Sequence, residues 1–131
     1  MQRRRVSSVR HAQPTGDATM WRLLYLAHVL LELVLGGVKL RGTYSGVVVP
    51  EAAAKFARHH GVSLLALTLL GALVLLRGQI STPTGQVTSI TLAAFHAGAV
   101  LVMIHAEHWP VVCTHAPFAL GFAAHALTGS F

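Results

Sequence analysis

Four long apolar stretches make up most of the chain after residue 20. Their approximate limits are 21–40, 57–77, 87–106 and 111–129. Each approaches the roughly 20 residues that a helix needs to cross about 30 Å of hydrocarbon. A water-soluble bundle would require polar helix faces, and windows such as LLALTLLGALVLL in the second stretch have none. The pattern therefore predicts an all-α, polytopic membrane protein with four transmembrane helices.

The links between these stretches are short and contain Gly and Pro. Thr82-Pro83-Thr84-Gly85 joins the second stretch to the third, and His108-Trp109-Pro110 joins the third to the fourth. Short links make consecutive helices antiparallel neighbours. Pro50 before Glu51 predicts the first turn of a short amphipathic helix leading into the second span. Glu51 and Lys55 are four residues apart, which indicates a solvated helix face. We therefore predict an antiparallel four-helix bundle with one longer loop.

Small residues in the later spans indicate where helices approach closely. Ala94 and Gly98, and then Ala119 and Ala123, repeat at four-residue spacing. Such spacing typically allows close packing within a membrane bundle or, as an alternative, self-association. Pro117 is expected to kink the fourth span or to start its regular part.

The first 19 residues differ from the rest of the chain. They hold four Arg and no acid before Asp17, and we expect a basic, disordered tail over 1–19 followed by the transmembrane domain over 20–131. A mitochondrial-type targeting segment, a cytoplasmic basic anchor and an extension before a true start at Met20 remain alternatives. The basic residues behind the net charge of +6 lie in this tail and at span ends. We therefore expect them to contact anionic lipid headgroups and to set the topology, and not to bind nucleic acid.

Charge asymmetry gives a slight preference for the orientation. Counted from Met1, six basic residues lie on the side of the termini and four on the other side, which favours cytoplasmic termini. Counting from Met20 reverses this preference. We expect the bacterial inner membrane, with the mitochondrial inner membrane as the alternative. The lone Cys113 excludes an internal disulfide.

Ionisable residues inside the spans are the strongest functional signal. Eight of the nine histidines lie in or at the ends of the apolar stretches. His28, Glu32 and His96 fall near mid-membrane depth, and His28 and Glu32 are four residues apart on one helix face. Intramembrane ionisable groups mark functional sites by default, although a neutral Glu32 could also act as glue between helices. We predict a ligand-binding site at these three residues.

A second set of histidines gathers at one membrane face. Alternating helix directions bring together His59, His60, His105, His108 and His115, with Glu107 and Cys113 nearby, while His125 lies toward the opposite face. Neutral imidazole is the commonest metal-binding side chain, so these five are candidate metal ligands. Their spacing contains no HExxH or CxxC motif. An interfacial role without metal remains the alternative.

The end of the first span, Leu35-Gly36-Gly37-Val38-Lys39-Leu40, followed by a longer loop and three more spans, resembles the DoxX-like group of small four-helix membrane proteins. That group generally has an acidic residue in its second span, whereas the intramembrane acid here is Glu32 in the first. The resemblance implies a bacterial membrane protein, some relatives being linked to quinone-dependent redox or sulfur metabolism. It assigns no catalytic residue.

These observations favour a small integral membrane protein of the binding or accessory type. It would act in a homo-oligomer or with a membrane-complex partner, and hold a quinone or lipid near His28, Glu32 and His96. The first alternative is a redox subunit carrying haem b or a metal, at His28 with His96 or at the five face histidines. The second is proton-coupled transport through Glu32. A nucleophilic hydrolase is disfavoured, because no Ser or Cys lies in a nucleophile motif.

Overall fold

Four long helices make up most of the described chain. The structure, a computed structural model, describes residues 16–44, 47–48 and 50–128. The helices are α1 Gly16–Leu40, α2 Glu51–Leu76, α3 Pro83–His105 and α4 Trp109–Thr128, and a two-residue antiparallel ladder, β1 Thr43–Tyr44 with β2 Val47–Val48, lies in the loop after α1. All four helices are long and apolar enough to cross a membrane. The predicted four-helix membrane bundle is therefore confirmed.

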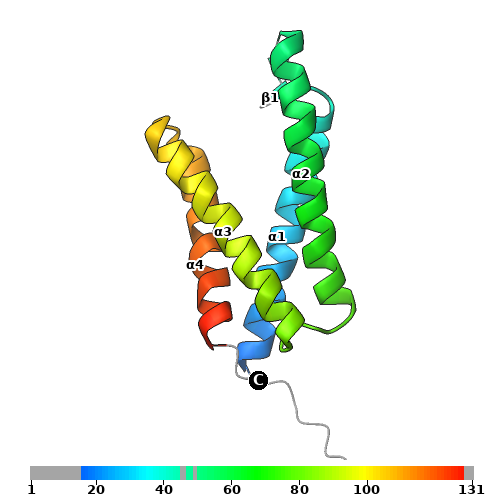
Figure 1. Cartoon of the computed structure of the whole chain (residues 1–131), viewed down its shortest axis with the longest axis vertical. Coiled ribbons are helices and arrows are strands. Elements are labelled where there is room, and N and C mark those ends of the chain that lie inside the picture. Colours follow the sequence, from blue (N-terminus) through cyan, green and yellow to red (C-terminus); the bar gives the residue numbers. More distant parts are fainter. Residues whose placement is uncertain (1–15, 45–46, 49, 129–131) are drawn as a thin grey trace, which may run out of the picture.

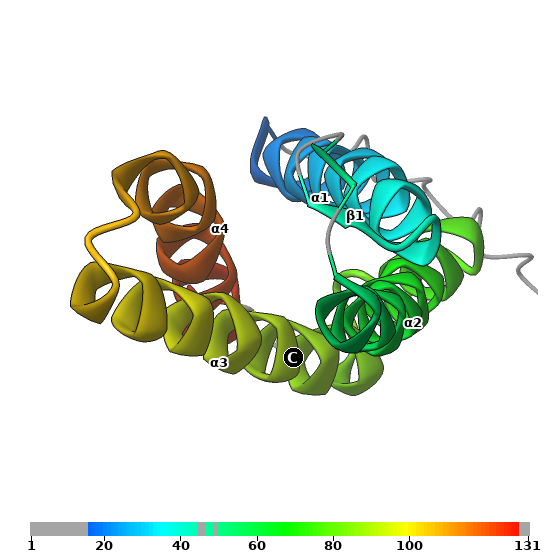
Figure 2. The same cartoon turned by 90° about the horizontal axis from the view of Figure 1, so that it is seen from above.

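The helices form two antiparallel hairpins. α1 packs along α2 and α3 packs along α4, whereas the two hairpins touch each other over smaller areas. Figure 1 shows them meeting at the end that holds the α2–α3 link and diverging toward the end that holds the α3–α4 link. Seen from above in Figure 2, α3 and α4 stand on one side and α1 and α2 on the other. A residue pair that joins α1 to α3 or α4 therefore joins one hairpin to the other.

Several helix boundaries differ from the predicted ones. α1 begins at Gly16, so part of the predicted tail is helical, while residues 1–15 lie outside the described part. α3 begins at Pro83, four residues before the predicted limit of 87, because the Thr82 side chain accepts from the Gly85 N–H and Pro83 takes the first helical position. Left-handed Gly42 and Gly78 follow the ends of α1 and α2, where only glycine adopts such a φ without strain.

The helix that begins at Glu51 is not a separate amphipathic segment. α2 runs without interruption from Glu51 to Leu76, and the exposed Glu51 carboxylate lies 3.5 Å from Arg58 Nη1 on the predicted solvated helix face. Pro117 likewise stands inside α4, which starts eight residues earlier, so the regular helix does not start at this proline.

One of the two predicted pairs of small residues does not face a neighbouring helix. Ala94 and Gly98 are exposed, and a Cβ on Gly98 would have no neighbour within 4 Å. The buried positions of α2 recur every three or four residues, as in a coiled coil: Ala54, Ala57, Gly61, Leu64, Thr68, Gly71 and Val74. Small residues of α2 therefore line its contact with α1, and Ala119 and Ala123 of α4 are half-buried.

The apolar core lies toward the end where the hairpins meet. Its buried members are Tyr25, Val74, Ile80, Leu92 and Phe122. They come from all four helices and from the α2–α3 link. The Tyr25 and Phe122 rings meet edge to face, with centroids 5.1 Å apart. This core holds the two hairpins together at the end of the bundle that contains the α2–α3 link.

Candidate metal centre

One face of α1 carries a buried polar stripe. Tyr25, His28 and Glu32 are spaced by three and four residues, which places them on the same side of the helix. None of the three has any exposed surface. The stripe contacts α3 and α4 of the second hairpin, so its polar atoms need partners there.

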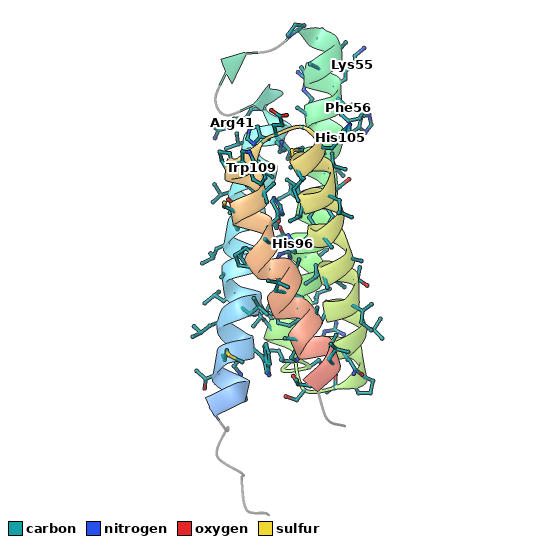
Figure 3. All side chains as sticks on the ribbon, turned by 90° about the vertical axis from the view of Figure 1, so that its left-hand side faces the viewer. Arg41, Lys55, Phe56, His96, His105 and Trp109 are labelled. Carbon is teal, nitrogen blue, oxygen red and sulfur yellow. The ribbon has the colours of Figure 1, made fainter. Side chains whose placement is uncertain are left out.

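His96 of α3 meets this stripe near the middle of the bundle. His96 Nε2 lies 3.0 Å from His28 Nδ1 and 4.0 Å from Glu32 Oε1, and His96 is also fully buried. The view in Figure 3 labels His96 at mid-height, well below His105 and Trp109 at the upper end. The three residues that the sequence placed at similar depth are thus in direct contact. We refer to His28, Glu32 and His96 as the triad.

Glu32 is the least satisfied member of the triad. Both of its carboxylate oxygens are buried and neither makes a hydrogen bond. Lys39, two helical turns along α1, attracts the carboxylate electrostatically but donates no hydrogen bond to it. His28 Nε2 makes no well-aligned hydrogen bond either, although the Leu67 main chain lies beside this ring. Each unpaired polar atom in a membrane interior costs on the order of several kcal/mol. The Glu32 carboxylate therefore needs a further binding partner.

His115 belongs to this buried cluster and not to the face histidines with which the sequence grouped it. Its Nδ1 lies 2.7 Å from His96 Nδ1, and only 7% of its surface is exposed. The position in α4 points toward the bundle axis because Val112, His115 and Phe122 share one buried face of that helix. Two imidazole contacts therefore run in series, from His28 through His96 to His115.

The other predicted metal ligands remain apart. His59, His105 and His108 are exposed, and His60 is half-buried. Among the described residues, the triad is the one group of three or more His, Cys, Asp or Glu side chains whose ligating atoms all lie within 4.8 Å of one another. The structure therefore brings His28, Glu32 and His96 together. It does not bring the five histidines predicted at one membrane face into such a group.

A second buried polar cluster was missed by the sequence analysis. Ser89 Oγ lies 2.7 Å from both the Tyr25 hydroxyl and His125 Nδ1, and the Tyr25 hydroxyl donates to the Gly85 carbonyl at 2.8 Å. Because each hydroxyl has one proton, Ser89 donates to Tyr25 and His125 donates to Ser89. A Ser seven residues before His96, on the same helix face, was the available signal. This cluster links α1, α3 and α4, and the Tyr25 and Ser89 hydroxyls and His125 Nδ1 all make hydrogen bonds.

The spacing of the triad suits a small cation. Two ligands at Zn–N distances of about 2.0 to 2.1 Å stand about 3.4 Å apart in a tetrahedral site, and the observed separations of 3.0 and 4.0 Å lie on either side of this value. All ligating atoms of the triad lie within 4.8 Å of one another, so a small shift of the carboxylate toward the two imidazoles would let the three side chains bind one ion. A haem held between His28 and His96 does not fit, because a porphyrin cannot enter between rings that are already in hydrogen-bonding contact.

The architecture defines the chain as an integral membrane protein built from two helical hairpins with a polar cluster at their junction. Comparison with models of protein families, with curated proteins and with solved structures finds no match. The DoxX-like resemblance thus stays a prediction, and the function must be argued from the cluster itself.

Proposed function

We propose that the protein binds a divalent first-row transition-metal ion inside the membrane, at the triad of His28, Glu32 and His96. The observation that carries this proposal is the Glu32 carboxylate, whose two buried oxygens lack any hydrogen bond beside an imidazole nitrogen 4.0 Å away. A cation between these groups would satisfy the carboxylate and replace the contact between the two imidazoles with two metal bonds. Buried charges in proteins are generally paired or bound to metals.

The donor set favours borderline ions. Imidazole suits Zn, Fe, Co and Ni, carboxylate suits Mn as well, and soft Cu(I) prefers the thiolate or thioether ligands that the triad lacks. Mg²⁺ and Ca²⁺ prefer shells made of oxygen. Two histidines and one carboxylate also leave coordination positions open, as in catalytic zinc and non-haem iron sites. We therefore expect Zn²⁺, Fe²⁺ or Co²⁺ to bind with at least one exchangeable ligand.

A quinone or lipid headgroup is supported less well at the same residues. His28, Glu32 and His96 have no exposed surface, so a headgroup would reach them only after the hairpins part. An ion requires only small shifts of the side chains already in contact. Proton transfer through Glu32 is the remaining rival, and it requires a carboxylate that takes up and releases protons without a resident ion.

Metal content of the purified protein tests the proposal. The protein would be prepared in mild detergent with an affinity tag that contains no histidine, loaded with Co²⁺ and measured by elemental analysis and visible absorption. We expect one tightly bound Co²⁺ per chain, with the ligand-field bands of a low-coordinate site, and loss of this ion in Glu32→Gln. Glutamine keeps the size of the side chain but removes the charge and one ligand oxygen.

Surface histidines require their own control because the chain has nine histidines in all. A variant with His59, His105 and His108 replaced by Gln should keep the tightly bound ion, since these side chains are exposed. Unchanged Co²⁺ content in Glu32→Gln, or loss of the ion in the surface variant alone, would refute the proposed site.

A further inference from the structure

We infer that His115 is a positioning residue for the metal site: in the ion-bound form its Nδ1 accepts a hydrogen bond from the His96 Nδ1–H and so holds in place the imidazole whose Nε2 binds the ion. This inference rests on the proposed metal-binding function. Its basis is the 2.7 Å contact between the two Nδ1 atoms, in a place that is almost fully buried. His115 itself lies outside the triad and supplies no ligand to it.

Counting protons gives the direction of this hydrogen bond. A neutral imidazole carries one N–H and one lone pair. If His96 Nε2 binds the ion, its proton must be on Nδ1, and the N–H there donates to His115 Nδ1. His115 then carries its proton on Nε2. Without an ion the hydrogen bond can run the other way, with His115 Nδ1–H donating to His96 Nδ1 and His96 Nε2–H donating to His28 Nδ1. His115 keeps a hydrogen bond to His96 in both forms, and in the ion-bound form it is the acceptor that the His96 Nδ1–H requires.

The same arrangement explains His28. With Nδ1 toward the ion, its proton lies on Nε2, beside the Leu67 main chain. Metal-bound histidines in proteins usually donate their second nitrogen to a carboxylate, a backbone carbonyl or water. His96 departs from this habit by using an imidazole as the acceptor. The identity of residue 115 is therefore decisive for His96 and has no such role for His28.

Two aromatic rings of α4 complete the support. The His96 ring stacks on Phe118 at 5.1 Å and 23°, and lies nearly parallel to Phe122 at 6.0 Å and 8°. These contacts fix the plane of the imidazole, while the hydrogen bond to His115 fixes its rotation within that plane. α4 thus provides no ligand of the triad yet orients the ligand that α3 provides.

His125 offers a matched control on the same helix. It is equally buried, and its Nδ1 also makes a 2.7 Å hydrogen bond, but to Ser89 in the separate cluster. Substitution of His115 or of His125 removes a buried imidazole from α4. Only the change at His115 removes the partner of a proposed ligand.

The experiment measures Co²⁺ affinity by competition with a chelator in His115→Asn, His115→Gln and His115→Leu. Asn places its amide oxygen where His115 has Nδ1, so it can accept from His96, whereas the oxygen of Gln is one bond further out. We expect near wild-type affinity for Asn and a loss of about 10- to 100-fold for Gln and Leu, the usual effect of removing such a supporting hydrogen bond. His125→Leu should bind Co²⁺ as the wild type does.

Failure of this inference is distinguishable from failure of the metal site. Wild-type affinity in His115→Leu, or equal losses in His115→Asn and His115→Gln, would overturn the role of His115 while Glu32→Gln still lost the ion. Since Asn and Gln are both polar and differ by one methylene, their comparison stays informative if the Leu variant fails to fold. Absence of tight Co²⁺ binding in the wild type would instead overturn both proposals.

Discussion

Gly36 and Gly61 face each other across the contact between α1 and α2. A Cβ on Gly61 would lie 3.0 Å from the Gly36 carbonyl oxygen and 2.9 Å from the Leu40 nitrogen. A Cβ on Gly36 would in turn lie 2.9 Å from the Leu65 side chain and 3.2 Å from the Gly61 carbonyl oxygen. Backbone therefore packs against backbone here, which sets the spacing between α1 and α2.

Gly61→Ala should destabilise the protein, because the new methyl group would meet main-chain atoms that cannot turn away. We expect a loss of about 1 to 3 kcal/mol, typical of overpacking. The measurement is unfolding in mixed detergent micelles. Gly37→Ala is the matched control, since a Cβ there has no neighbour within 4 Å. Equal stability of the two alanine variants would contradict this account of the hairpin.

Ion binding should stabilise the folded chain in proportion to ion concentration. A ligand that binds only the folded state adds about 2.7 kcal/mol at a free concentration 100 times its Kd. Thermal unfolding of the wild type should therefore shift upward with Co²⁺ or Zn²⁺ and return on addition of a chelator. Glu32→Gln should show no such shift. A shift of the same size in that variant would place the stabilising ion elsewhere.

Tyr25→Phe should weaken the second polar cluster while leaving the metal site intact. The change removes the hydroxyl that donates to Gly85 and accepts from Ser89. Hydrogen bonds between membrane helices contribute about 0.6 kcal/mol on average, with a maximum of about 1.7, and we expect a loss of stability within that range. Thr91→Val is the comparison, because the exposed Thr91 hydroxyl bonds only to Val87 of its own helix. A large fall in Co²⁺ affinity in Tyr25→Phe would show that the two clusters are coupled.

The single cysteine can report membrane orientation. Cys113 is exposed near the start of α4. Figure 1 shows that α4 starts at the end of the bundle opposite to the start of α1. With the termini in the cytoplasm, a membrane-impermeant maleimide should label Cys113 in right-side-out vesicles and fail to do so in inverted ones. Ser81→Cys in a Cys113→Ser background gives the converse test, because Ser81 is exposed in the link at the other end. The reverse pattern would place the termini outside.

The fold was predictable because hydrophobic length alone defines a membrane span. The runs after Met20 and the short links gave four helices and their order, and those are the features that the bilayer thickness determines. The start of α1 at Gly16 was not predictable in this way, since polar residues there extend a helix beyond the apolar stretch. α3 likewise begins before its apolar stretch, because Thr82 caps it and Pro83 takes its first position. A Thr followed by a Pro is a helix-start signal that can be seen in the sequence.

The candidate site was predictable only in depth. Counting residues places His28, Glu32 and His96 at one level, but the rotation of each helix about its axis decides which side chains meet. His115 illustrates the limit. Its position near the start of the fourth span suggested the membrane face, whereas packing turns it inward onto His96. The prediction that Ala94 and Gly98 pack against a neighbouring helix was wrong for the same reason. Their spacing does not show which side of α3 faces another helix.

The contact between His28 and His96 joins residues 68 positions apart in the chain. An ion held there would act as a reversible cross-link between an early hairpin and a late one. Membrane helices first insert separately and then associate, so the ion would have no complete site until α3 had followed α1 into the bilayer. Cross-links that close long loops restrict the unassembled chain most in theory. The availability of the ion would then govern how many inserted chains reach the assembled state, and not how many chains are inserted.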